Sequence, residues 1–298
     1  MRRIRSSGFT LVELVVSITL IGILAVAAVP MLRLPMTAYL DANRRADLAS
    51  ALDLTVGKIG SDLAQALPNS IRVRQVGARY FLEYLEVRAS GRYRSGPSLA
   101  PQSCPAICTL PAGNDMLEFA CPESCFTTLG PLQGNAPVPG ADYVVVNPLG
   151  PGIPGGDPYF GGAALPPGGI KSVLQSVAAV AGGSRITMTP HAFPAGPASR
   201  QFYVVATPVS YECNPATQRL TRYWGYPVAA VQPVAFAAAQ AAPLATAVAA
   251  CTFRYTATGG VGRGGVVSLW LRFTQAAAGL AGAESVDAFT QFSVREQP

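Results

Sequence analysis

Charged residues are scarce in this chain, and histidine is almost absent. Of the 298 residues 13% are charged, and the single histidine, His191, lies between Pro190 and Pro194, where we expect a loop. One such histidine makes no acid–base or nucleophile constellation. The formal net charge is +6, but three of those charges come from arginines within the first five residues, which leaves too little to indicate nucleic-acid binding. We therefore expect neither an enzyme, a bound cofactor nor a nucleic-acid partner.

The chain has one long apolar run, at residues 9–29. Its 21 residues, at about 1.5 Å each in a helix, span about 31 Å, the thickness of a bilayer core. A second, alanine-rich stretch at 228–250 is interrupted by four residues unsuited to a membrane span: Gln232, Pro233, Gln240 and Pro243. We expect that stretch to form a loop and a short helix leading into a strand at Cys251.

Residues 1–8 differ from an ordinary secretory signal. Three arginines, Arg2, Arg3 and Arg5, precede the apolar run and predict a cytoplasmic N-terminus by the positive-inside rule. The small residues, among them Gly8, also come before the run rather than after it. This order predicts that cleavage removes a leader of residues 1–8 on the cytoplasmic side, and that the helix anchors an exported domain in the inner membrane.

One acidic residue, Glu13, lies in the apolar run. An unpaired carboxylate near hydrocarbon costs several kcal/mol, so Glu13 needs a partner. The new α-amino group of Phe9, on the same chain or on a neighbouring subunit, would supply a cation after cleavage behind Gly8. A plain anchor helix whose Glu13 reaches the headgroups is the alternative, and polarity alone leaves both open.

Seven residues around the start of the run form a specific motif: Gly8-Phe9-Thr10-Leu11-Val12-Glu13-Leu14. This string resembles the processing signature of type IV pilins and type II secretion pseudopilins. The resemblance implies that a prepilin peptidase cuts after Gly8 and methylates Phe9, and that Glu13 pairs with the N-terminus of an adjacent subunit. Other implied partners are the major pilin, other minor pilins and an inner-membrane assembly platform. Pro30 falls where family members often carry a helix-breaking proline, which permits a kink.

Beyond the apolar run, residues 30–67 show helical periodicity. Five apolar residues recur at spacings of four and seven: Leu48, Leu52, Ile59, Leu63 and Leu67. We expect this amphipathic helix to continue from the membrane segment, to bend again at Pro35 and to end before Pro68. Two separate helices joined by a short linker remain the alternative.

Residues 68–298 are predicted to form a β-rich head. Eight segments are rich in aromatic and β-branched residues: 80–87, 143–146, 186–189, 202–207, 220–226, 252–255, 266–273 and 288–294. Between 130 and 169, twenty of forty residues are glycine or proline, which predicts an irregular surface loop. The fold class is therefore α+β, a long N-terminal helix packed on a mainly antiparallel sheet, as in type IV pilins.

Three further segments carry a finer resemblance: 67–73 (LPNSIRV), 91–94 (GRYR) and 251–255 (CTFRY). They are similar to segments of the MshO-type minor pilin of mannose-sensitive haemagglutinin (MSHA) pili. The resemblance implies a low-copy subunit that helps to initiate, assemble or cap the filament. A minor pseudopilin of a type II secretion system and an adhesive or ligand-binding head on a pilin stalk are the alternatives.

The six cysteines form an even set outside the apolar run: Cys104, Cys108, Cys121, Cys125, Cys213 and Cys251. An oxidising compartment, and hence disulfides rather than a four-thiolate zinc site, is the natural interpretation. Six cysteines allow fifteen pairings. A hairpin turning at 113–115 would align Cys104 with Cys125 and Cys108 with Cys121, leaving Cys213 to pair with Cys251. Local bridges, Cys104–Cys108 and Cys121–Cys125, remain the alternative.

Overall fold

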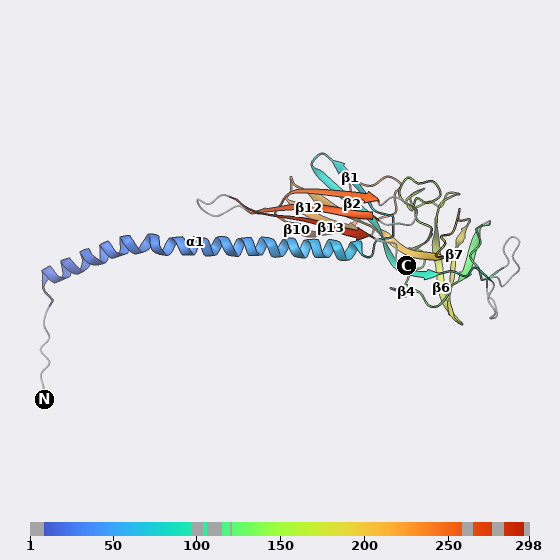
Figure 1. Ribbon diagram of the computed structural model, residues 1–298, viewed down its shortest axis with the longest axis horizontal. Coiled ribbons are helices and arrows are strands. Elements are labelled where there is room, and N and C mark those ends of the chain that lie inside the picture. Colours follow the sequence, from blue (N-terminus) through green and yellow to red (C-terminus); the bar gives the residue numbers. More distant parts are fainter. Residues whose placement is uncertain are drawn as a thin grey trace, which may run out of the picture.

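A long helix and a β-rich head make up the computed structural model (Figure 1). The structure describes residues 9–96, 104–105, 115–119, 121–257, 265–275 and 283–294. Helix α1 (Leu11–Leu63) has 53 residues and is about 80 Å long. Its first part projects away from the head, and its last part runs along it (Figure 1). The predicted α+β arrangement is confirmed.

Helix α1 is continuous through both of its prolines. Pro30 and Pro35 lie within its helical range, so the alternative of two helices joined by a linker is wrong. The ribbon curves gently over the N-terminal part of α1 without a break (Figure 1). A proline inside a helix removes one hydrogen bond but does not have to end the helix. A sharper kink at Pro30 stays a prediction.

The C-terminal end of α1 lies four residues before the predicted end. The helix stops at Leu63 instead of Leu67. Leu67 N–H donates to the carbonyl of Leu85 at 2.7 Å, and Val87 N–H donates to the carbonyl of Gln65 at 2.8 Å. These bonds to a neighbouring strand replace helical ones, so the backbone leaves the helix before the proline at 68.

The head contains two sheets. The larger, ten-stranded sheet consists of β1 (Arg72–Val76), β2 (Arg79–Arg92), β3 (Glu123–Thr127), β4 (Gln133–Gly134), β5 (Tyr143–Val146), β6 (Lys171–Val180), β7 (Gly183–His191), β8 (Gln201–Asn214), β9 (Arg219–Trp224) and β10 (Gln240–Thr246). Its order is β1-β2-β8-β5-β6-β7-β3, with β4 on β2 and the β9–β10 pair on β8. The smaller sheet has the order β11 (Val248–Ala257), β12 (Gly265–Gln275), β13 (Glu284–Val294). All pairs of named strands in the described residues are antiparallel.

Most of the predicted strand positions are correct, but the structure predicted for the alanine-rich stretch is wrong. Each of the eight predicted segments falls wholly or largely within a strand, whereas five strands, β1, β3, β4, β6 and β10, are not among the predicted segments. Residues 228–239 form loops and turns, and 240–246 form strand β10 in place of the expected short helix. The reason is pairing: β10 lies antiparallel to β9, and a strand partner overrides weak local propensity.

Two further predictions concern the segment around 130–191. The stretch 130–169 is irregular apart from β4 and β5, as expected, but it also packs tightly, because Tyr159 is fully buried and its hydroxyl donates to the carbonyl of Ser70 at 2.7 Å. His191, expected in a loop, is instead the last residue of β7 and is buried. Its Nε2 lies 2.8 Å from the carbonyl oxygen of Gly169. His191 is therefore held in the packed head by a backbone contact.

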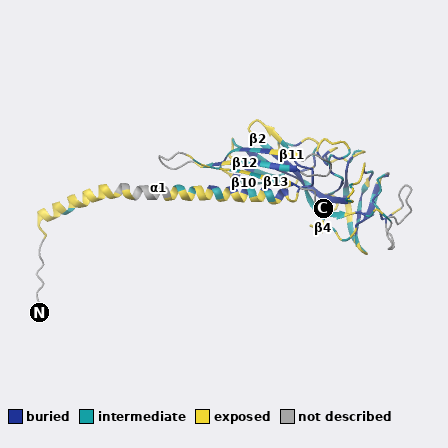
Figure 2. Cartoon of the chain, viewed as in Figure 1, coloured by how far each residue is buried: buried dark blue, intermediate teal, exposed yellow. Residues whose placement is uncertain are grey.

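The smaller sheet joins α1 to the larger one. Leu48, Leu52, Ile59 and Leu63, four of the five residues of the predicted apolar stripe, are buried in one core with residues of β2, β8, β11 and β12, and α1 packs against β12 and β13. Figure 2 shows the resulting contrast between an exposed N-terminal part of α1 and a partly buried C-terminal part. The helix is therefore fixed to the head by only its second half.

The contact between α1 and β13 depends on a glycine. A Cβ at Gly60 would lie 2.5 Å from Cε1 of Phe292, whereas a Cβ at Gly57 has no heavy atom within 4 Å. We expect Gly60→Ala to destabilise the head by about 1 to 2 kcal/mol, because overpacking outweighs the better helix propensity of alanine. Gly57→Ala, the matched control, should stabilise it by about 0.5 to 1 kcal/mol. Denaturant unfolding of both variants measures this; equal stabilisation by both would contradict the close approach.

A disulfide joins the two sheets. Cys213 of β8 is bonded to Cys251 of β11, the pair that the sequence favoured. It closes a loop with a sequence separation of 38, so the double variant Cys213→Ser/Cys251→Ser is expected to lose about 3 to 4 kcal/mol of unfolding free energy in the chain-entropy model. The control is Cys104→Ser/Cys125→Ser, whose loop is shorter, at a separation of 21. A larger loss in the control, measured by denaturant unfolding, would contradict the prediction.

Candidate functional site

The N-terminal end of α1 is formed by a capping interaction between Thr10 and Glu13. Thr10 is the N-cap residue, with extended backbone angles of φ −81° and ψ 149°. Glu13 N–H donates to Thr10 Oγ1 at 3.3 Å, and the Thr10 hydroxyl donates to Glu13 Oε2 at 3.4 Å. Thr-x-x-Glu is the spacing of a capping box. The helix thus begins two residues after Phe9, and the Glu13 carboxylate turns back toward the N-terminal end.

Thr10 was not predicted from the sequence to be part of this site. The signal was present, because a threonine followed three residues later by a glutamate at the head of an apolar run predicts a helix N-terminus. A cap at Thr10 holds Glu13 in the first turn, where the positive end of the helix dipole favours a negative charge. Thr10 is therefore a positioning residue for Glu13.

The Glu13 carboxylate has no cationic partner within the described part of the chain. Its one side-chain contact is the long bond to Thr10, which does not neutralise its charge. Phe9, next to the cap, has 72% of its surface exposed, and Gly8 lies outside the described residues. The geometry leaves Glu13 open to a cation at the helix end or on another chain.

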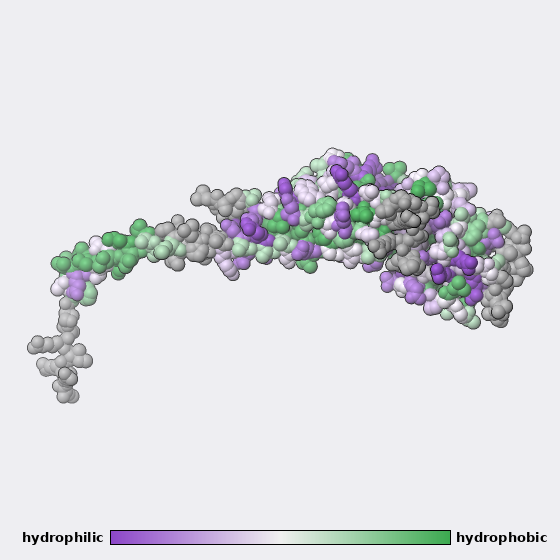
Figure 3. All heavy atoms as spheres, viewed as in Figure 1, coloured by the Kyte–Doolittle hydropathy of each residue, from purple (hydrophilic) through white to green (hydrophobic). Residues whose placement is uncertain are grey.

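Beyond Glu13, the helix surface up to Ala28 is almost entirely apolar. Leu11–Ala28 is long and apolar enough to cross a membrane, with a mean hydropathy of 2.5 and none of its residues buried within the protein. Its two hydroxyl residues bond to the helix itself: Ser17 Oγ donates to the carbonyl of Glu13 at 2.7 Å, and Thr19 Oγ1 to that of Val15 at 3.0 Å. Figure 3 shows this apolar surface projecting from the head. Such a surface suits lipid or the helices of other subunits.

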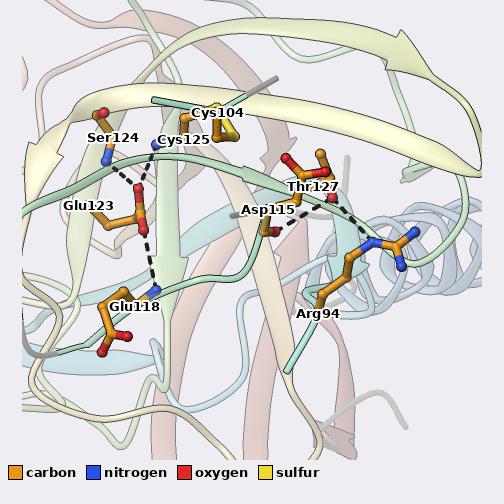
Figure 4. The surroundings of a disulfide bond; sticks show 8 residues. All are labelled: Arg94, Cys104, Asp115, Glu118, Glu123, Ser124, Cys125 and Thr127. Atoms are coloured by element: carbon orange, nitrogen blue, oxygen red, sulfur yellow. Dashed lines mark hydrogen bonds between the residues drawn. A yellow bond between two sulfur atoms is a disulfide. The ribbon is translucent and has the colours of Figure 1, made fainter. Parts of the chain in front are cut away.

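A cysteine site lies at the other end of the molecule, in the distal lobe, the part of the head that contains β3, β6 and β7 (Figure 1). Cys104 is bonded to Cys125, the first residue pair of the proposed nested bridges (Figure 4). The hairpin used to derive that pair is wrong, because Cys125 lies in β3, whose partner is β7, and Cys104 lies in no strand. Cys121 is also disulfide-bonded, while Cys108, its expected partner, lies outside the described residues.

Next to this disulfide, the backbone holds a buried carboxylate. Glu123 accepts N–H groups from Ser124 at 2.8 Å, Cys125 at 2.9 Å and Glu118 at 3.4 Å (Figure 4). Burial raises the pKa of Glu123, and these bonds partly oppose the shift. No group of three or more potential metal-ligating side chains occurs among the described residues. A disulfide between Cys104 and Cys125 removes two of the four thiolates of the zinc alternative.

Comparison with known proteins gives one match. A family model described as the prokaryotic N-terminal methylation motif matches residues 3–29. No curated protein and no solved structure matches the chain. The matched segment contains the capped helix start, Glu13 and the apolar surface, and the head adds antiparallel sheets packed on the same helix. Residues 3–29 therefore carry the processing signature of a type IV pilin-like or pseudopilin-like prepilin, and α1 supplies the apolar helix that anchors such a prepilin in the membrane.

Proposed function

We propose that this prepilin is a minor pilin of an MSHA-like type IV pilus, and that it acts in initiation, assembly or capping of the filament. The observation that supports this role is the position of the distal lobe, which contains β3, β6 and β7. These strands lie beyond the C-terminal end of α1, in the direction away from the membrane segment (Figure 1).

A filament position follows from this shape. Pilin helices pack side by side in the filament core, as the resemblance implies, with the heads directed away from the membrane. A lobe that extends past the end of its own helix would occupy the space of the subunit added before it, on the side nearer the tip. A subunit at the tip has no neighbour on that side, so the shape favours a terminal position over a repeated shaft position.

The test is the copy number and location of the subunit. Sheared filaments are analysed by quantitative mass spectrometry and by gold labelling of an epitope in the head. We expect a copy number far below that of the major pilin, with label at one end. Label along the whole shaft would contradict the proposal. In a deletion strain, unchanged pilus number together with lost protein secretion would instead support the pseudopilin alternative.

Processing of the leader is a separate prediction. We propose that the peptidase cuts after Gly8, because in the family that this motif resembles only a residue without a side chain suits the position before the cut. Gly8→Ala is expected to abolish most processing, whereas Ser7→Ala, the matched control, should be cut normally. Intact-mass spectrometry of the purified chain measures both. A mature N-terminus other than methylated Phe9, or normal processing of Gly8→Ala, would contradict the assignment.

A further inference from the structure

Two arginines that form no ion pair with any described residue flank a small pocket in the distal half of the head. The pocket has a volume of about 160 Å³ and is lined by Arg92, Leu129, Ala198, Ser199 and Arg200. Arg92 ends β2, and Arg200 immediately precedes β8. The backbone ties these walls together, since Leu129 N–H donates to the carbonyl of Arg92 at 2.8 Å and Tyr93 N–H to that of Arg200 at 3.0 Å. These two backbone hydrogen bonds fix the positions of the segments that line the pocket.

Buried polar atoms without partners lie beside these arginines. Ser199 Oγ and Gln201 Oε1 are both buried, and neither has a hydrogen-bond partner in the described part of the chain. Only 6% of the surface of Gln201 is exposed, and it lies opposite Arg92 in the β2–β8 register. Buried polar groups are nearly always bonded, so each exception calls for an explanation. A bound polar ligand at the pocket would explain the unbonded hydroxyl of Ser199.

The backbone of Arg200 is also unusual. Its φ of 57° lies in the left-handed region, which costs free energy for a residue with a side chain. Arg200 forms no ion pair with any described residue. An ion pair within the described chain therefore does not explain its backbone conformation. Strained backbone of this kind is concentrated at binding sites, where it sets the direction of a functional side chain.

Two more arginines lie in the same part of the head, Arg94 two residues after the end of β2 and Arg185 on β7. Arg94 Nε donates to Thr127 Oγ1 at 3.2 Å, and Arg185 lies opposite Thr127 in the β3–β7 register. Neither forms an ion pair with a described residue. Two nearby carboxylates form no ion pair with an arginine among the described residues: Glu123 is bonded to backbone N–H groups, and Asp115 lies in no ion pair. Like charges held near one another attract an anion.

We propose that this pocket, hereafter the anion pocket, binds a single tetrahedral oxyanion, the phosphate or sulfate group of an ester. Arg92 and Arg200 provide planar, always charged donors that match such a group on two sides, and the hydroxyl of Ser199 provides a third donor. The volume suits one oxyanion group rather than a whole lipid or sugar chain. The site is independent of the proposed position in the filament.

The experiment uses the full mature chain in a nonionic detergent. Methyl phosphate and methyl sulfate are titrated by calorimetry at constant ionic strength, with chloride as the balancing anion to remove general screening. We expect saturable binding of one ion per chain. Arg92→Gln and Arg200→Gln should each raise the Kd about tenfold or more, and Ser199→Ala about threefold to tenfold. Glycerophosphoglycerol, a soluble phosphodiester, stands for a lipid headgroup. If it binds as tightly as methyl phosphate, the natural ligand is a lipid headgroup; if methyl phosphate binds more tightly, the ligand is a phosphate monoester.

Arg254→Gln is the matched control. Arg254 is also an exposed arginine, but it lies on β11 of the smaller sheet and has no ion pair among described residues. It should leave the Kd unchanged. Near-ultraviolet circular dichroism checks that each variant is folded, and the small change at Ser199 tests the site even if an arginine variant is not. Equal loss in Arg254→Gln, or no binding above the chloride baseline, would overturn the proposal.

Discussion

Glu13→Ala is expected to leave processing and membrane insertion intact and to lower incorporation into filaments by an order of magnitude or more. The physical reason is that the Glu13 carboxylate lies in an apolar helix without a cationic partner in the described chain. A charge buried among packed helices is stable only beside an opposite charge. Co-purification of the variant with partner pilins, relative to wild type, measures the effect.

Two controls separate the charge of Glu13 from its role in the cap. Glu13→Gln keeps the length of the side chain and its bonding to Thr10 but removes the charge, so it should assemble as poorly as Glu13→Ala. Thr10→Ala removes the cap, which costs only about 1 kcal/mol, and should assemble much better. If Glu13→Gln assembles normally while Thr10→Ala does not, the site works through helix capping and our assignment is wrong.

Asp62→Ala is expected to destabilise the head by about 3 to 5 kcal/mol, because it leaves a partly buried arginine without its partner. Asp62 lies near the end of α1 with 4% of its surface exposed. Its Oδ2 accepts bonds from the hydroxyl of Tyr211 at 2.5 Å and from Arg222 Nε at 2.7 Å, and its Oδ1 from Lys58 Nζ at 2.6 Å. These contacts join α1 to β8 and β9 of the larger sheet. Denaturant unfolding measures the loss.

The same network predicts a dependence on pH. Burial by itself raises the pKa of Asp62, but the bonds from Lys58, Tyr211 and Arg222 outweigh it, and the pKa is lowered. A lowered folded-state pKa gives stability that is present above the unfolded pKa and is lost as the pH falls through the folded one. Asp62→Ala should therefore flatten the acid limb of the stability curve.

The control for Asp62 is another acid on the same helix. Asp53 is exposed and has no ion pair among the described residues, so Asp53→Ala should change stability by no more than about 0.5 kcal/mol. If Asp62→Ala also changed the free energy of unfolding by no more than about 0.5 kcal/mol, and left its dependence on acidic pH unchanged, the network would contribute little to joining the helix and the sheet.

The parts of the fold that could be predicted from sequence are those with a strong local pattern. In β12, Val267, Leu269, Leu271 and Phe273 are buried while the residues between them are not, which is the alternation that the sequence shows. Strands β6 and β10 could not be predicted in this way. The alanine-rich β10 has little β-propensity of its own, and the valines of β6 are separated by serine, glutamine and alanine; each pairs with a neighbouring strand, β10 with β9 and β6 with β7.

Of the two candidate sites, one could be predicted from the local sequence and the other could not. The motif at 8–14 is local, because the peptidase signature, the cap and the apolar run all depend on neighbouring residues. The sequence by itself therefore determined that the chain carries the N-terminal signature of an anchored prepilin. The anion pocket brings together residues near 92, 129 and 200, which no sequence pattern connects. The C-terminal end of α1 was likewise decided by backbone bonds to β2 rather than by the proline at 68. Such features need tertiary structure, because they depend on hydrogen bonds and packing between residues far apart in the chain, whereas helix periodicity and hydrophobic length depend only on the residues within a segment.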